Sequence, residues 1–161
     1  MKIFSAFLVM ALIVSCNSQS VEQTKITDSL QKQLSETYRP GLGEFMLGIQ
    51  THHAKLWFAG QYQNWPLADF EIHEIEESLD DIQKYCNDRP EVKSIGMIRP
   101  PIDSINNSIK RTDLPSFKKN FALLTNTCNT CHQATEHGFN VVIIPTSPPV
   151  SNQDFKPPNT K

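Results

Sequence analysis

The sequence predicts an all-α fold, an up-down-up-down four-helix bundle that is followed by an extended, proline-rich C-terminal tail. Apolar residues recur every three or four positions in four segments between positions 41 and 138, and no segment shows the sustained alternation of a β-strand. Five of the eleven prolines fall within positions 145–161. A length of 161 residues leaves room for one domain with appendages, and a net charge of -2 argues against a nucleic-acid binder that uses a basic face.

The first fifteen residues predict a targeting segment. Lys2 is followed by an apolar run, Ile3 to Val14, which is short for a bilayer span and therefore favours a cleaved signal peptide. The last four residues before the polar region, Ile13-Val14-Ser15-Cys16, resemble a bacterial lipobox, in which Cys16 becomes the lipidated first residue of the mature protein. The alternative is an ordinary signal peptide with an incidental cysteine. We expect an exported, membrane-anchored lipoprotein on the periplasmic or cell-surface side.

Residues 16–40 are polar and predict a tether, with some helix over Leu30 to Thr37. The predicted helical domain, residues 41–138, begins with a helix of about twenty residues that ends near Gly60 and the Asn64-Trp65-Pro66 run; Pro66 suits the first turn of the next helix. The second helix ends at Arg89-Pro90. The apolar stripes of these two helices are Leu42, Met46, Ile49, His53, Leu56 and Gly60, then Ile72, Ile75, Leu79, Ile82 and Cys86.

A turn over Met97 to Pro101 is expected to precede a shorter third helix. Thr112 or Asp113 can cap a fourth helix, which has Pro115 in its first turn and ends at Gly138. The stripe of this last helix has the spacing that nearly antiparallel packing needs. Beyond it, residues 139–161 form the extended tail. The stripes are Ile102, Ile105 and Ile109, then Leu114, Phe117, Phe121, Leu124, Cys128 and Cys131.

The last helix carries Cys128-Asn129-Thr130-Cys131-His132, which is the C-x-x-C-H attachment signature of c-type haem. Two thiols three residues apart can each add to one porphyrin vinyl group, and the adjacent imidazole can then reach the iron. A thioredoxin-like pair would need a strand before the motif, and a zinc site would need a fourth ligand. A disulfide and a chance match remain as alternatives. We therefore predict one haem c per chain, with Cys128 and Cys131 as thioether anchors and His132 as the axial ligand.

Both thiols continue the apolar stripe of their helix, which places the haem against the bundle interior. In these features the chain resembles the cytochrome c′ superfamily, including its low-spin cytochrome c556-like members, which are exported four-helix bundles with the motif on the last helix. The resemblance covers residues 41–138. It rests on the motif together with the predicted architecture. The tail departs from that pattern, and Val141 to Phe155 are expected to cover an exposed haem edge.

Met46 is the candidate for the sixth iron ligand. In an antiparallel bundle the start of the first helix lies beside the end of the fourth, and Met46 and His132 then fall at the same height. The resemblance also implies a distal side that is supplied by the first helix. A methionine on an apolar stripe is otherwise core filling. His53 is the rival ligand, although it stands about two turns further along the helix.

The other candidate residues are given structural roles. One residue of the pair His52 and His53 is expected to form a hydrogen bond inside the bundle while the other meets solvent. His73 is expected to be solvated, and His137 to close the last helix, where the helix dipole favours a cation. Cys86 is expected to be a buried thiol. Trp57 and Trp65 are expected to brace the first interhelical corner, with the haem pocket as their alternative location.

The leading functional hypothesis is a membrane-tethered, single-haem electron carrier, with redox partner proteins that the sequence does not identify and a possible homodimer. One alternative is a gas-binding or gas-sensing haem protein with an open distal site. The other is a haem-free structural lipoprotein whose Cys128 and Cys131 form a disulfide. No enzymatic activity is predicted, because no nucleophile-base pairing, phosphate-binding glycine loop or second metal cluster is visible in the sequence.

Overall fold

The computed structural model describes residues 22–158, so the predicted signal peptide and Cys16 lie outside the described part of the chain. The chain divides between Arg39 and Pro40, and each part is described by itself. In the first part a helix spans residues 22–36, which is longer than the helix predicted over 30–37. One stripe of this helix is apolar and more than half exposed; it consists of Ile26, Leu30 and Leu34.

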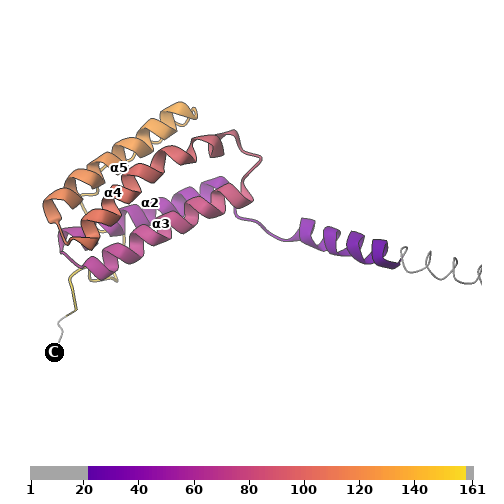
Figure 1. Ribbon diagram of the computed structural model, residues 1–161, viewed down its shortest axis with the longest axis horizontal. Helices are drawn as coiled ribbons and strands as arrows, with labels where there is room; N and C mark the ends of the chain where they lie inside the picture. The colour runs from indigo at the N-terminus through magenta and orange to yellow at the C-terminus, as the bar shows by residue number, and fades with distance from the viewer. Residues whose placement is uncertain (1–21, 159–161) are drawn as a thin grey trace, which may run out of the picture. The chain divides into compact units, whose positions relative to one another are not determined.

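The part from residue 40 onward is helical, and no β-strand is present in residues 22–158, which confirms the all-α prediction. Figure 1 shows the four α-helices of this part. A 3-10 helix lies between the second and the third of them. The elements are α2 (Leu42–Gln61), α3 (Trp65–Tyr85), η1 (Pro90–Ile98), α4 (Arg99–Lys110) and α5 (Leu114–Ala134).

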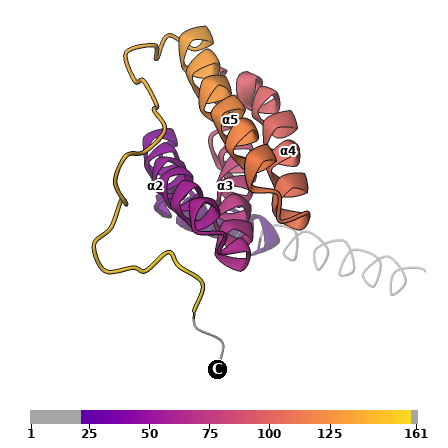
Figure 2. The ribbon, with the colours of Figure 1, turned by 90° about the vertical axis from the view of Figure 1, so that its left-hand side faces the viewer.

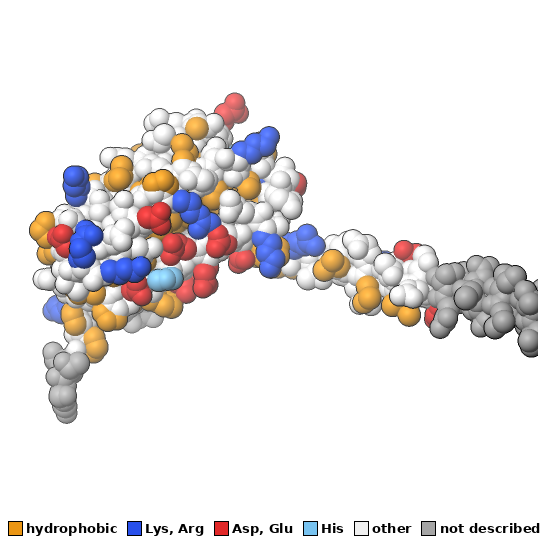
Figure 3. Space-filling view, in the orientation of Figure 1, with side chains coloured by type: hydrophobic (Ala, Val, Ile, Leu, Met, Phe, Trp, Pro, Cys, Tyr) orange, Lys and Arg blue, Asp and Glu red, His pale blue; other side chains and the backbone are white. Residues whose placement is uncertain are grey.

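The four α-helices pack in a closed sequence of neighbours. Helix α2 packs against α3, α3 against α4, α4 against α5, and α5 against α2 (Figure 2). Charged side chains of both signs are interspersed on the face that Figure 3 shows. Within residues 22–158, no helix combines the length and the apolar character that a membrane crossing requires.

The predicted helix starts at α3 and α5 are confirmed by their caps. The Asn64 side chain accepts a hydrogen bond from the Leu67 amide at 3.4 Å, and Pro66 lies in the first turn of α3. The Asp113 carboxylate accepts from the Ser116 amide at 3.1 Å at the start of α5. A side-chain acceptor and a nearby proline satisfy or remove the unpaired amides of a first helical turn, which is why both starts were readable from the sequence.

Two predicted boundaries are wrong. Met97 lies in η1 and Pro101 lies in α4, so the segment 97–101 is not a turn between helices. Helix α5 ends at Ala134 and not at Gly138, because Glu136 adopts a left-handed conformation (φ 63°) that a continuing helix excludes. Nothing in the local sequence pattern required Glu136 rather than Gly138 to take that conformation.

The core beside the α2–α3 corner is aromatic. Phe117 and Phe121 of α5 are fully buried. The Trp57 ring lies 4.8 Å from Phe121, and the Trp65 ring lies 6.0 Å from Phe117, edge-on. The two tryptophans therefore brace this corner, as predicted.

The tail, described to residue 158, contains no helix or strand and lies across the helical body. After α5 it runs past α2 toward the C-terminus, as Figure 2 shows. Its Phe155 side chain is buried and lies 5.8 Å from the Phe58 ring of α2. The Lys156 carbonyl accepts a hydrogen bond from the Asn64 side chain at 3.2 Å. The tail is thus attached to the helical body beside the α2–α3 corner.

Candidate functional site

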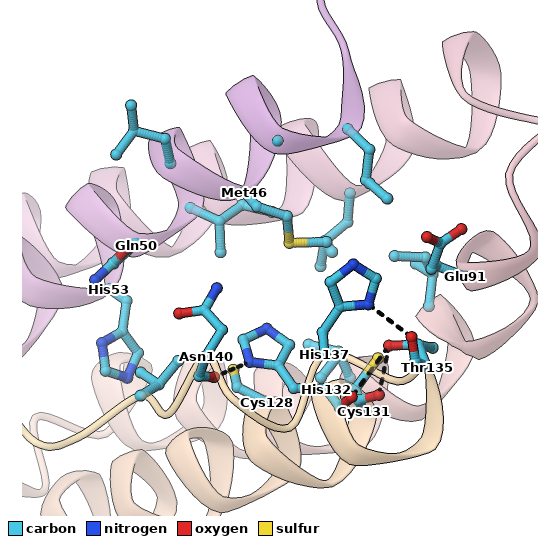
Figure 4. A pocket seen from close by; sticks show the side chains of 18 of the residues that line it. Met46, Gln50, His53, Glu91, Cys128, Cys131, His132, Thr135, His137 and Asn140 are labelled. Carbon is cyan, nitrogen blue, oxygen red and sulfur yellow. Dashed lines mark hydrogen bonds between the residues drawn. The ribbon is translucent and has the colours of Figure 1, made fainter.

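A mostly apolar cavity of about 540 Å³ lies between α2, α3, η1, the end of α5 and the first residues of the tail (Figure 4). We call it the motif cavity. Its volume is in the range of small-molecule and cofactor sites. Apolar side chains line it from every element, and polar side chains join them from α2, α5 and the tail. Two charged side chains, Arg89 and Glu91, line it at the start of η1. The other lining residues include Leu42, Met46, Ile49, His53, Ile75, Leu79, Ile95, Ile98, Leu124, Cys128, Cys131, His132, Thr135, His137, Asn140 and Val142.

The two motif cysteines line the cavity together. A separation of three residues places both side chains on one face of α5, and both thiols are free. Burial and the neighbouring Cys131 raise the pKa of Cys128 to about 11, and burial also raises the pKa of Cys131. At neutral pH both thiols are therefore protonated. This does not suit a thioredoxin-like pair, which depends on a thiolate of lowered pKa.

The His132 imidazole is held in one tautomer. Its Nδ1 lies 2.6 Å from the backbone carbonyl oxygen of Asn140, which Figure 4 shows as a dashed line. A carbonyl oxygen only accepts hydrogen bonds, so Nδ1 must carry the proton and donate it. In the neutral imidazole, Nε2 is then the nitrogen with a free lone pair. A histidine that ligates a metal commonly makes this second hydrogen bond to a carbonyl or carboxylate.

Met46 reaches the same cavity from α2. It lies in the second turn of that helix, and its side chain is half-buried. Figure 4 shows its thioether directed into the cavity on the side opposite α5. The structure therefore places Met46 and His132 around one cavity.

His53 lines one end of the cavity but is engaged in another bond. Its Nε2 lies 2.9 Å from the Thr125 hydroxyl, and that hydroxyl donates to the Phe121 carbonyl at 2.9 Å. Since the hydroxyl has a single proton, His53 Nε2–H must be the donor. The His53 ring also packs at 4.4 Å from the Phe121 ring, and burial lowers the pKa of His53 to about 4. This nitrogen is not free for a metal.

The expectation that one of His52 and His53 meets solvent while the other is bonded inside is wrong for His52. Its Nδ1 lies 2.7 Å from Oε2 of Glu71, a fully buried residue of α3. Lys55 Nζ lies 3.7 Å from the other Glu71 oxygen. His52 is kept partly buried because the desolvated Glu71 carboxyl needs hydrogen-bond donors. The sequence pattern did not single out Glu71, which stands among exposed acidic residues of the same helix.

The prediction that His137 closes the last helix is wrong. This residue lies in the loop after α5, half-buried, where it lines the cavity and its Nδ1 lies 2.6 Å from the Thr135 carbonyl oxygen. The early end of α5 moves it there. The predictions for the remaining residues hold, because Cys86 is buried and His73 is exposed. Trp57 and Trp65 do not line the motif cavity.

Two residues of the site, Asn140 and Thr125, could not be predicted from the C-x-x-C-H motif. Asn140 acts through its backbone carbonyl, which carries no side-chain signal, and Thr125 is separated from His53 by 72 residues. Within residues 22–158, no group of three or more His, Cys, Asp or Glu side chains is arranged to hold a metal ion. A comparison with known proteins gives no relative: no protein-family model, no curated protein and no solved structure matches the chain.

Proposed function

We propose that this protein is a monohaem c-type cytochrome that carries single electrons in an extracytoplasmic compartment. One observation supports the proposal most strongly. The C-x-x-C-H motif borders a mostly apolar cavity with two free thiols and with a histidine whose Nδ1 is already engaged, so that Nε2 has its lone pair free.

The chain's residues fit a covalently attached haem. Cys128 and Cys131 would each add their S–H across one vinyl group: a carbon–sulfur bond forms, the proton goes to the neighbouring carbon, and no oxidant is consumed. This addition requires reduced thiols, and no disulfide joins the two cysteines in the structure. Bound haem would supply a one-electron couple whose potential depends on axial ligands, burial and hydrogen bonds. The apolar walls, including Ile75 and Leu124, would keep water away from it.

Met46 would be the second axial ligand. Its thioether points into the cavity, whereas His53 donates its Nε2 proton to Thr125. A closed sixth position is what separates an electron carrier from a gas-binding protein, since exogenous ligands need an open one. The chain's own contribution is therefore to hold one ligand on α2 and the other on α5.

The proposal extends to architecture and location. We assign α2 to α5 to an up-down-up-down bundle of the cytochrome c′ kind, which the sequence of neighbouring helices supports. The tail would cover one edge of the haem, since Asn140 and Val142 line the cavity. A lipid on Cys16 would attach the protein to a membrane through the segment 16–40.

The test is the visible spectrum of the mature protein, expressed with a cytochrome c maturation system, in both oxidation states and with carbon monoxide. We expect covalent haem that Cys128→Ser together with Cys131→Ser removes. The spectrum should be low-spin and unaffected by carbon monoxide. Met46→Ala should convert it to a form that binds the gas, because the sixth position is then open.

Met97→Ala is the matched control, since Met97 is a partly exposed methionine of η1 that does not line the cavity. It should leave the spectrum unchanged. A parent protein without covalent haem would contradict the proposed function. A parent that binds carbon monoxide would instead support the gas-binding alternative, and an unchanged spectrum in Met46→Ala would remove Met46 as the ligand.

A further inference from the structure

The middle of the C-x-x-C-H motif is bonded to the tail. Asn129 is half-buried on α5, and its side-chain amide makes two hydrogen bonds to one tail residue, Val142. Asn129 Nδ2 donates to the Val142 carbonyl at 2.8 Å, and the Val142 amide donates to Asn129 Oδ1 at 2.8 Å. The side chain thus satisfies both backbone groups of Val142, as a neighbouring strand would.

This pair of bonds lies two residues from the carbonyl that orients the proximal histidine. Asn140 accepts from His132 Nδ1 at 2.6 Å, and its own amide donates to the His137 carbonyl at 2.9 Å. The turn at His137 holds Asn140 from one side. On the C-terminal side of Asn140, the Asn129 side chain holds Val142. Asn129 therefore fixes where the tail leaves the turn.

We infer that Asn129 is a positioning residue for His132. By holding Val142, it keeps the Asn140 carbonyl against His132 Nδ1, which fixes the imidazole tautomer and strengthens Nε2 as an electron donor to iron. The inference rests on the proposed function and goes beyond it, because it assigns a role to a variable position of the motif and to the tail.

The chemical consequence has a definite sign. A hydrogen bond from Nδ1–H to a carbonyl raises the basicity of the imidazole. A more basic ligand stabilises ferric iron more than ferrous iron, since the ferric ion carries the greater charge. Loss of the Asn129–Val142 bonds should therefore raise the reduction potential of the haem.

The test compares the full-length holoprotein with Asn129→Ala and with Val142→Pro, which removes the Val142 amide donor without changing α5. Asn126→Ala is the control, because Asn126 is an exposed asparagine of the same helix. We expect both test variants to shift the ferrous-to-ferric ratio at a fixed potential by about tenfold toward ferrous, which equals about 59 mV for a one-electron couple. Asn126→Ala should not shift it.

Two further measurements identify the cause. In Asn129→Ala the Val142 amide should lose protection from hydrogen exchange, and the iron–histidine stretching frequency of the ferrous Met46→Ala form should fall when Asn129→Ala is added. Combining Asn129→Ala with Val142→Pro should shift the potential no more than either change alone, since both break the same contact.

The outcomes separate the inference from the proposed function. A parent protein without covalent haem overturns both. A haem-loaded parent whose potential is unchanged in Asn129→Ala and Val142→Pro overturns the inference alone, and so does retained protection of the Val142 amide in Asn129→Ala. If Asn129→Ala fails to fold, Val142→Pro decides the question.

Discussion

His53 is a neutral imidazole in the interior, and its protonation links pH to stability. It is 3% exposed, it donates to Thr125 and it packs on Phe121. A second proton would leave a buried charge without a partner, because the Thr125 hydroxyl already donates its own proton elsewhere. Burial accordingly lowers the pKa of His53 from 6.5 to about 4.

The first prediction is a loss of stability in acid. Between pH 6.5 and 4 the unfolded chain binds a proton at His53 that the folded chain does not, so the free energy of unfolding falls as the pH falls through this window. The loss between pH 7 and pH 4.5 should be about 2 kcal/mol, measured by urea unfolding. The stability is fully present above pH 6.5.

His53→Gln should flatten this pH dependence, because the substituted side chain does not titrate. The exposed His73 is the control, and His73→Gln should leave most of the slope in place. An equal slope in the parent and in His53→Gln would show that other groups cause the acid sensitivity.

At the residue scale, the sequence predicts contacts that follow from local spacing better than contacts between distant residues. Cys128, Cys131 and His132 share the cavity because positions three and four residues apart lie on one face of a helix. The preference for Met46 over His53 as the proposed iron ligand depends on Thr125, because Thr125 accepts the His53 Nε2 proton. The sequence pattern does not connect Thr125 to either residue. Height along the helix predicts Met46 as the ligand, whereas the hydrogen bond that engages His53 is visible only in the fold.

At the scale of helices, α2 and α5 approach each other closely at one glycine. A Cβ atom added to Gly60 would overlap the ring of Phe117, which is fully buried and held between Trp57 and Trp65. The missing side chain is therefore what lets the end of α2 lie against the start of α5. Gly48, on the same helix, has open space around it.

The second prediction is that the same glycine-to-alanine change has opposite effects at two positions of α2. Gly60→Ala should destabilise the protein by about 1–3 kcal/mol, because a rigid buried ring must move. Gly48→Ala should stabilise it by about 0.5–1 kcal/mol, because alanine is the better helix former and meets no obstacle. Thermal or urea unfolding measures both. A stabilising Gly60→Ala would mean that Phe117 has room to shift and that the α2–α5 contact is looser than the structure has it.

Helix starts were more predictable than helix ends. Asn64 and Asp113 indicate the starts of α3 and α5 because their side chains accept hydrogen bonds from amides three residues further on. The end of α5 was misplaced because Glu136, which has no special preference for a left-handed conformation, adopts one. The turn that follows Glu136 is held by backbone hydrogen bonds, among them the one from the Asn140 amide to the His137 carbonyl. The Asn129 side chain then bonds to Val142 of the tail.

At the scale of the whole molecule, the part from Pro40 onward contains every residue of the proposed haem site. Its core, its cavity and the buried Phe155 of the tail all belong to this part, and so does the contact of the buried Cys86 thiol with the Pro40 carbonyl. The helix over residues 22–36 lies on the other side of the division at Arg39. The two parts should therefore have separable roles, haem binding and membrane attachment.

The last prediction separates these roles. An exported fragment that begins at Pro40 should bind haem covalently, with the spectrum, reduction potential and unfolding midpoint of the full-length protein, because it contains the core and all of the site.

Full-length Cys16→Ser should keep the same spectrum but move from the membrane fraction to the soluble fraction, because a lipidated cysteine supplies most of the membrane affinity. Cys86→Ser is the control for the loss of a thiol, and it should stay with the membrane. If Cys16→Ser also stays there, the attachment does not depend on a lipid at that cysteine; a fragment that binds no haem would show instead that residues before Pro40 take part in forming the site.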